Sequence, residues 1–193
     1  FHDDDLDDAG WDVDFELAVP ANLKSGIYAI KISTDGGDDH LPFFVRPPKG
    51  TATAPVLFLV PTNSYLAYAN IHVFKRIDVF VEMAKKLSDV EDVEDTFVFD
   101  YPSTDPDKYM FNNKLNSLYD YHREGSGVSY SSRLRPILNM RPGYNLPLLG
   151  LAKGAPHQLN ADLHLTDWLE TMGYDFDVAT DEDLHFEGKA LLE

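Results

Sequence analysis

Side chains able to do chemistry gather in two short segments that each follow an apolar run. These segments are Pro61–Asn70 (PTNSYLAYAN) and Thr180–Glu187 (TDEDLHFE). The first contributes two phenols, Tyr65 and Tyr68, and the second contributes a histidine and a carboxylate, His185 and Glu187. Phenolate and carboxylate oxygens are hard ligands that suit ferric iron, manganese or magnesium, and phenolate in particular stabilises ferric iron. The residue types therefore point to oxygen-ligand chemistry with a histidine nearby.

Each of these features also has a purely structural interpretation. Tyr65 and Tyr68 are three residues apart and could pack together at the start of a helix. Asp181 and Glu182 could be N-cap and first-turn carboxylates that face the positive end of a helix dipole. Pairs of ligand-type residues such as His185-x-Glu187 occur often by chance. The residues taken individually leave both interpretations open.

The common catalytic motifs are absent from the sequence. There is no G-x-S-x-G elbow, no H-E-x-x-H pair, no phosphate-binding G-x-x-x-x-G-K and no G-x-G-x-x-G. There is also no cysteine, which excludes disulfides, zinc–thiolate sites and a cysteine nucleophile. The oxygen atoms of Tyr, Asp and Glu side chains therefore remain as the candidates for a reactive or metal-binding site.

The charge balance limits the classes of partner. The net charge is −17 over 193 residues, which argues against nucleic acid and anionic membrane surfaces. No apolar run reaches the roughly 18 residues that a membrane-spanning helix needs. The absence of cysteine fits a cytoplasmic protein. These features exclude partner classes and do not indicate a cationic substrate, because excess acidity usually serves solubility or salt tolerance.

The elements that must position the two segments follow from three apolar runs. Continuous apolar stretches are typical of parallel strands covered on both faces, and they occur at Pro55–Pro61, Thr96–Phe99 and Phe176–Thr180. Leu165, Trp168, Leu169 and Met172 recur at helical spacing before the last run, and Gly173 supplies a C-cap. We therefore expect an α/β fold with an open, mostly parallel sheet. Both chemistry-bearing segments would lie at the carboxyl edge of that sheet, where ligands bind.

The first 48 residues follow a different pattern. Asp12–Leu17 alternates polar and apolar residues, and Ile27–Ser33 and His40–Arg46 flank a Gly-rich turn. These three segments predict antiparallel strands of a β-sandwich-like domain. We expect residues 1–48 to end that domain and residues 49–193 to form the first part of an α/β catalytic domain. Three strands make a poor sandwich, so the chain is expected to be an internal piece of a longer protein.

Several runs together resemble the large (beta) subunit of N,N-dimethylformamidase and its relatives. They are Ser25–Tyr28, Leu41–Arg46, Pro61–Asn70, Asn116–Asp120, Gly125–Pro142, Asp162–Glu170 and Thr180–Gly188. The resemblance covers nearly all of the chain from about residue 12 onward. It implies a glutamine-amidotransferase-like α/β domain that follows β-rich domains of the same subunit.

The resemblance also implies a mononuclear Fe(III) centre held by two tyrosines and a glutamate. Matched by motif, the ligands are Tyr68, Tyr119 and Glu187, with His185 as an outer or proton-transfer group. Tyr65 is the rival to Tyr68, and Tyr65 and Asn70 are expected to contact the substrate. Further residues that could orient these groups are Asn116 and Arg133, although Arg133 and Arg135 could equally pair with carboxylates.

The function implied by the resemblance is hydrolysis of a small N-substituted amide such as N,N-dimethylformamide to formate and dimethylamine. The implied partners are the remaining domains of the same subunit and a small accessory subunit, in a hetero-oligomer. Two alternatives stay open. The chain could be a non-catalytic interaction module, or an iron-dependent hydrolase of the same scaffold acting on another C–N bond.

Overall fold

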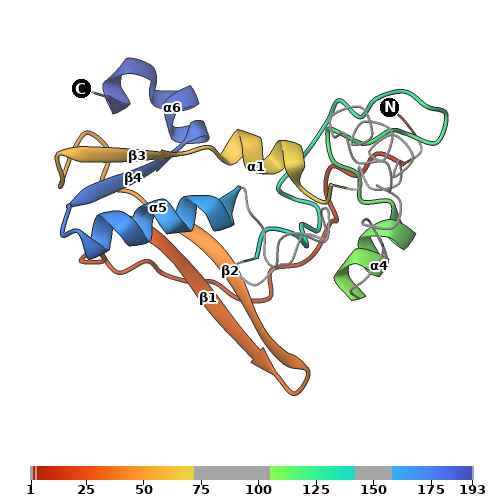
Figure 1. The fold of residues 1–193 in the computed structure, drawn as a ribbon, viewed down its shortest axis with the longest axis horizontal. Helices are drawn as coiled ribbons and strands as arrows, with labels where there is room; N and C mark the ends of the chain where they lie inside the picture. The colour runs from red at the N-terminus through yellow and green to blue at the C-terminus, as the bar shows by residue number, and fades with distance from the viewer. Residues whose placement is uncertain (1, 3, 72–104, 142–157, 193) are drawn as a thin grey trace, which may run out of the picture. The chain divides into compact units, whose positions relative to one another are not determined.

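The structure of the chain is a computed structural model, and it describes residues 2, 4–71, 105–141 and 158–192 (Figure 1). The chain divides into two compact units, which are described separately. Unit 1 is formed by Phe1–Ala9, Leu66–Asn139 and Gly143–Pro156. Unit 2 is formed by Gly10–Tyr65, Met140–Pro142 and His157–Glu193. The proposed domain boundary near residue 48 stays a prediction.

The first regular secondary structure in unit 2 is a β-hairpin. Strands β1 (Gly26–Thr34) and β2 (Gly37–Val45) pair antiparallel, in a register that runs from Gly26 opposite Val45 to Thr34 opposite Gly37. Two residues connect them, as the Gly-rich turn predicts. Figure 1 shows the hairpin as a long two-stranded arm. The two strands expected in this region are confirmed.

The expected parallel strands of unit 2 are present as a pair. Strands β3 (Val56–Val60) and β4 (Phe176–Thr180) pair in parallel, and the register ends with Val60 opposite Thr180. Four of the five residues of β4 are buried, as expected for a strand covered on both faces. The third predicted strand, Thr96–Phe99, lies outside the described residues. The fold is therefore mixed α/β, with one antiparallel and one parallel pair of strands in the described part of the chain.

Helix α5 (Leu159–Thr171) confirms the predicted amphipathic helix, and Gly173 follows it in the left-handed region with φ +76°. The predicted apolar stripe is wrong in its orientation, however. Leu169 is buried, but Leu165, Trp168 and Met172 are 44%, 51% and 56% exposed. The helix begins earlier than its apolar repeat indicated, and its buried side runs through Leu159 and Thr166 instead.

The core of unit 2 joins α5 to the parallel strands. Its buried members come from both strands, from α5 and from Tyr65, and they are Val60, Tyr65, Leu159, Leu169, Phe176 and Val178. Ile27 and Phe44 of the hairpin pack against this cluster. Burial of these apolar side chains supplies most of the driving force that fixes β3 next to β4.

The prediction of a strand over Asp12–Leu17 is wrong. The segment has no regular secondary structure, and Trp11, Val13 and Phe15 are 72%, 76% and 52% exposed. Alternation of polar and apolar residues creates a strand only where a second strand completes the hydrogen-bond ladder. No other strand pairs with this segment among the described residues.

Unit 1 consists of one helix and a long irregular segment in its described part. Helix α4 spans Asp105–Asn113, and isolated bridges join Tyr121 to Gly127 and Asp8 to Leu134. Residues 114–141 form turns and loops around these bridges. Within the described ranges of the chain, no helix has the length and apolar character needed to cross a membrane.

The burial pattern of α5 predicts unequal effects of two leucine truncations. We expect Leu169→Ala to lower the free energy of unfolding by about 2–5 kcal/mol, because it removes methyl groups from the core. We expect the matched change Leu165→Ala, one helical turn earlier on an exposed site, to alter it by about 0.5 kcal/mol or less. Denaturant unfolding of the two variants measures both values. Equal losses would contradict the observed orientation of the helix.

Candidate functional site

The two chemistry-bearing segments begin at the same edge of the parallel strand pair, as predicted. Helix α1 (Thr62–Tyr68) starts two residues after β3, and helix α6 (Asp181–Glu187) starts directly after β4. Because Val60 and Thr180 are register partners, both helices begin side by side. The edge of the sheet is therefore the place where the two segments meet.

Hydrogen bonds join the beginnings of α1 and α6. The backbone N–H of Asn63 donates to Asp181 Oδ2 at 2.9 Å. The hydroxyl of Thr62 donates to the carboxylate of Glu182. These carboxylates satisfy donors at the start of α1, where backbone N–H groups lack partners within the helix. The two acids thus have a structural role at the helix starts.

The beginning of α6 is closed by a capping box. The hydroxyl of Thr180 accepts from the Asp183 backbone N–H at 3.3 Å, and the Asp183 carboxylate accepts from the Thr180 N–H at 2.9 Å. Asp181 and Glu182 occupy the first turn, which confirms their interpretation as first-turn carboxylates. The N-cap residue itself is Thr180.

Glu187 at the end of α6 forms a two-pronged ion pair with Arg46. Arg46 Nη1 lies 2.7 Å from Glu187 Oε1, and Nη2 lies 3.1 Å from Oε2. Arg46 Nη1 also donates to Asp183 Oδ1 at 2.7 Å. The hydrogen bond from Arg46 lowers the pKa of Glu187 below its ordinary value. Glu187 is therefore held as a carboxylate in a fixed orientation.

His185 lies on the same helix and is exposed. Its ring meets the ring of Phe186 edge to face, with centroids 5.2 Å apart. Glu187 lies two residues after His185, directly before the short 3-10 helix η2 (Gly188–Leu191). The imidazole is therefore accessible to solvent.

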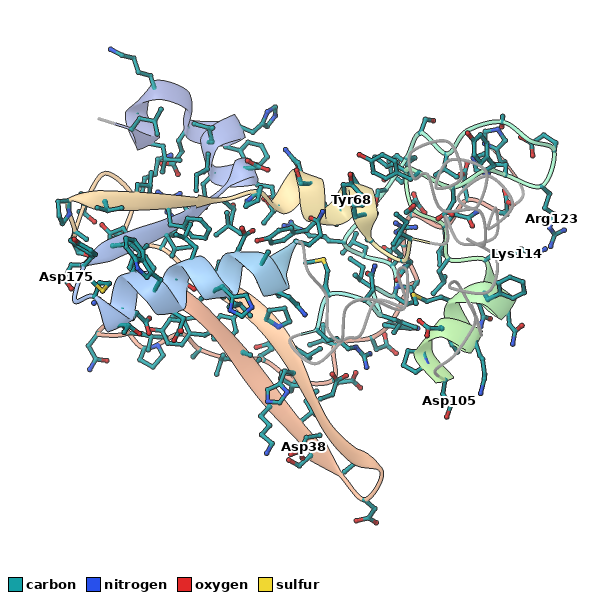
Figure 2. All side chains as sticks on the ribbon, in the orientation of Figure 1. Asp38, Tyr68, Asp105, Lys114, Arg123 and Asp175 are labelled. Atoms are coloured by element: carbon teal, nitrogen blue, oxygen red, sulfur yellow. The ribbon has the colours of Figure 1, made fainter. Side chains whose placement is uncertain are left out.

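Tyr68 and Tyr119, which are far apart in the sequence, are in contact in unit 1. Their ring centroids are 4.3 Å apart and the ring planes are inclined by 31°. Figure 2 labels Tyr68 on helix α1. A hydrogen bond with the Tyr119 side chain raises the pKa of Tyr68, and burial raises it further. The backbone joins the two segments as well, because the Leu118 N–H donates to the Ala67 carbonyl at 3.0 Å.

Arg135 holds the segments that carry these two tyrosines. Its guanidinium is buried and donates to the backbone carbonyl of Asn116. It also donates to Ser131 Oγ at 2.9 Å and to the Ala69 carbonyl at 3.4 Å. The sequence left open whether Arg135 would pair with carboxylates, and its hydrogen bonds go to neutral oxygens instead. Arg133, the other arginine considered, is exposed.

Asn70 is a buried clamp at the end of the Pro61–Asn70 segment. It adopts φ 59°, a left-handed conformation that asparagine tolerates better than most residues. Its Nδ2 donates to the Pro136 carbonyl at 2.6 Å, and its Oδ1 accepts from the Leu138 N–H at 2.9 Å. Both ends of the amide are thus engaged by the main chain.

Tyr65 belongs to the core of unit 2. Its side chain is 1% exposed, and its hydroxyl donates to the carboxylate of Asp162. Burial raises the pKa of this phenol, and the hydrogen bond to Asp162 raises it further. Tyr65 and Tyr68 therefore have different surroundings although they share one helix.

The structure thus brings Tyr68 and Tyr119 together, while Glu187 and His185 share helix α6 of unit 2. The complete ligand set of Tyr68, Tyr119 and Glu187 stays a prediction. Sequence reasoning missed the ion pair of Arg46 with Glu187. An arginine at the end of a strand in a chain with 33 acidic residues was the available signal.

Comparison with known proteins places the chain in a family. The pattern that describes the C-terminal part of N,N-dimethylformamidase beta subunit-like proteins matches residues 1–193. The chain belongs to this family. The N,N-dimethylformamidase beta subunit of Alcaligenes sp is 43% identical over 192 residues, and that of Paracoccus aminophilus is 43% identical over 194. Each match covers the whole chain but only 23% of the relative's length.

The buried guanidinium of Arg135 predicts a large loss of stability when it is removed in this dimethylformamidase-family chain. We expect Arg135→Met to lower the free energy of unfolding by about 3 kcal/mol, since it breaks charge-assisted hydrogen bonds to buried oxygens. Arg133→Met, two residues away and exposed, is the matched control and should change it by about 0.5 kcal/mol or less. Denaturant unfolding gives both values. A stable Arg135→Met variant would show that the hydrogen bonds of Arg135 are not needed for stability.

The ion pair of Arg46 predicts a specific dependence of stability on pH. The folded-state pKa of Glu187 lies below the 4.5 of the free group, so the pair stabilises the fold above about pH 4.5 and this contribution is lost as pH falls through the lowered pKa. We expect the Tm of the protein to fall on acidification more steeply than that of Arg46→Met. Thermal melts between about pH 7 and about pH 3 measure this.

Lys49→Met provides the control for the Arg46 experiment. Lys49 Nζ is 3.9 Å from Glu187 Oε1, and its side chain is 78% exposed. Exposed ion pairs contribute little because solvent screens them. The pH profile of Lys49→Met should follow that of the unmodified protein. Identical profiles for Arg46→Met and the unmodified protein would mean that Arg46 does not control the ionisation of Glu187.

Proposed function

We propose that this chain forms part of the ferric iron site of an amide hydrolase that cleaves small N-substituted amides such as N,N-dimethylformamide. The observation that carries the proposal is the contact between Tyr68 and Tyr119, whose ring centroids are 4.3 Å apart. Membership of the dimethylformamidase beta subunit-like family supports it. The chain spans about a quarter of the length of its curated relatives, so the activity belongs to the larger protein.

The donor chemistry fits ferric iron. Two phenols and one carboxylate would supply three hard anionic oxygens, which balance the charge of Fe(III). Glu187 is already ionised through Arg46, and such outer hydrogen bonds commonly orient a ligating carboxylate. The hydrogen bond with Tyr119 raises the pKa of Tyr68, and ligation of iron by this phenol would displace its proton.

Tyr68 is favoured over Tyr65 as the second phenol. The Tyr65 hydroxyl is buried and engaged with Asp162, so ligation by Tyr65 would leave that carboxylate without its donor. Ligation by Tyr68 would replace its hydrogen bond with Tyr119 by a metal bond. Asn70, whose amide is bound by the main chain, then acts by fixing the turn after Tyr68.

The proposed reaction needs no side-chain nucleophile. When bound, ferric iron would supply Lewis-acid polarisation of the amide carbonyl and a lowered pKa for water. His185, exposed on α6 two positions before Glu187, would hold or deliver the proton that the leaving amine requires. Arg46 would keep Glu187 charged and oriented throughout.

The wider architecture is proposed on the same basis. We infer that β3 and β4 belong to an open, mostly parallel sheet of the glutamine-amidotransferase type, with residues 49–193 as its first part and residues 1–48 as the end of a β-sandwich-like domain. The curated relatives are named beta subunits, which supports further domains and an accessory subunit as partners.

Tyrosine variants of the full-length protein test the iron site. Ferric phenolate gives a visible charge-transfer band, so we expect the purified protein to be coloured and to release dimethylamine from N,N-dimethylformamide. Tyr68→Phe and Tyr119→Phe should each lose the band and lower the rate on the order of 100-fold or more, beyond the effect usual for outer-shell residues. Iron analysis, absorption spectra and amine release measure these outcomes.

Two further variants make this test specific. Tyr121→Phe alters an exposed phenol of the same loop and should keep both band and activity. Tyr65→Phe removes the hydroxyl that serves Asp162, so it should lower stability while it keeps the band. Loss of the band in Tyr65→Phe, with the band intact in Tyr68→Phe, would make Tyr65 the ligand. A colourless, iron-free full-length protein would refute the proposal.

The substrate has its own test. If the protein contains iron but does not release dimethylamine, a panel of larger amides identifies the C–N bond that it cleaves. Activity toward none of them, together with an unchanged band in all tyrosine variants, would favour the non-catalytic alternative.

A further inference from the structure

A second group of potential metal ligands lies in unit 1 and is chemically different from the tyrosine pair. It consists of His2, Asp5 and His122, whose ligand atoms all lie within 4.8 Å of one another. Two imidazoles and one carboxylate form a mixed nitrogen and oxygen donor set. None of these residues takes part in the proposed iron site.

His122 is the central member of the group. Its side chain is 2% exposed, and its Nδ1 lies 2.7 Å from Asp4 Oδ1. A carboxylate only accepts hydrogen bonds, so Nδ1 carries a proton and Nε2 is the nitrogen left to bind a metal ion. This arrangement, in which a carboxylate fixes the tautomer of a histidine, is the usual one behind metal-binding histidines.

The Nε2 atom of His122 is buried and has no hydrogen-bond partner among the described residues. The closest acid is Asp5, whose Oδ1 lies 3.7 Å away, too far for a hydrogen bond. A buried polar atom without a partner costs about 1–3 kcal/mol. A metal ion bonded to Nε2 would remove this cost.

His2 approaches the same carboxylate from the other side. Its Nδ1 lies 3.4 Å from Asp5 Oδ2, and its Nε2 lies 3.3 Å from Glu124 Oε1. Ser126 Oγ is also near Nε2, at 3.2 Å. The His2 and His122 rings stack with centroids 3.7 Å apart. Each histidine thus has one nitrogen toward Asp5 and the other toward a second acidic side chain.

The geometry points to a binding site for a divalent transition-metal ion of the Zn²⁺ class, ligated by His122 Nε2, His2 Nδ1 and one oxygen of Asp5. Ligand atoms bonded to tetrahedral zinc at about 2.0–2.1 Å lie about 3.3 Å from one another. His2 Nδ1 lies 3.4 Å from Asp5 Oδ2 and His122 Nε2 lies 3.7 Å from Asp5 Oδ1, so each nitrogen lies near a different oxygen of the same carboxylate. The His2 and His122 rings are inclined by only 14°, so both imidazoles must rotate out of the stack for their lone pairs to reach one ion.

The donor set selects the class of ion. Imidazole nitrogens favour zinc, copper, iron and nickel, whereas calcium and magnesium prefer oxygen ligands throughout. The chain has no cysteine, so no thiolate competes for these ions. Zn²⁺ is therefore the appropriate probe.

The fourth coordination position of such an ion would lie on the side of His2 and Asp5. His2 and Asp5 line a cavity of about 310 Å³ together with Asp7, Ser129 and Tyr130. A water molecule in this cavity completes the coordination of the ion, as in zinc sites with three protein ligands.

The bound ion connects two segments that are far apart in the sequence. His2 and Asp5 come from the first residues of the chain, whereas His122 lies in the loop that follows Tyr119. That loop is closed by hydrogen bonds from the His122 N–H to the Ser126 carbonyl at 2.9 Å and from the Gly125 N–H to the His122 carbonyl at 3.0 Å. The ion fixes the loop at its turn, and its site does not depend on the iron site.

Zinc binding to chelator-treated full-length protein tests the site. We expect the protein to bind Zn²⁺ in competition with a chromophoric chelator and to raise its Tm on binding. His2→Ala, at a partly exposed position, should weaken this binding on the order of 100-fold or more, and Asp5→Asn should do the same. Asp4→Asn alters only the residue behind His122, so a loss of about 10–100-fold is expected.

His164→Ala is the matched control, because it removes an exposed histidine of helix α5 in unit 2. It should bind Zn²⁺ with unchanged affinity. The visible band of the proposed iron site should persist in His2→Ala, and zinc uptake that depends on His2 in a colourless protein would support this site while refuting the iron site. Equal zinc affinity and stoichiometry in His2→Ala, Asp5→Asn and the unmodified protein would overturn the inference.

Discussion

The parallel pairing of β3 with β4 is the constraint on which unit 2 depends. Carboxylates fix it at both ends. At the amino end, Asp177 accepts hydrogen bonds from the backbone N–H groups of Thr53 and Ala54 at 2.6 and 3.0 Å. At the carboxyl end, Asp181 accepts from Asn63. A slip of one residue would exchange the two buried faces of β4 and break these bonds together. The excess of acidic residues therefore serves the fold, because several of them satisfy backbone donors.

Basic residues are scarce in this chain, and Arg46 and Arg135 each serve several oxygens. The chain has 16 Lys and Arg residues against 33 Asp and Glu. Arg46 pairs with two carboxylates of α6, so it keeps like charges from repelling one another at the end of one short helix. Arg135 instead binds backbone carbonyls and joins the turn after Tyr68 to the segment before Tyr119. Its planar, five-donor guanidinium can serve several oxygens at once, which a lysine could not reproduce.

The sequence predicted the elements whose signals are local. Continuous apolar runs gave β3 and β4, the Gly-rich turn gave the hairpin, and topology gave the shared edge where α1 and α6 begin. It failed where the outcome depends on distant parts of the chain. Alternation over Asp12–Leu17 shows which side chains share a face, but not whether a second strand pairs with it. The Asn70 side chain forms hydrogen bonds with the main chain of Pro136 and Leu138, and bonds to main-chain atoms leave no pattern in residue types.

The two proposed metal sites follow from the same limitation on chemistry. Without cysteine, the chain can discriminate between metals only by the balance of oxygen and nitrogen donors. The proposed set of phenols and a carboxylate would select a hard trivalent ion, whereas the proposed set of two imidazoles and a carboxylate would select a borderline divalent one. Tyr119 and His122 lie three residues apart in one loop, yet Tyr119 turns to Tyr68 and His122 turns to Asp4 and Asp5. One loop can thus contribute to two sets of ligands, because the neighbours of Tyr119 and those of His122 orient the two side chains differently.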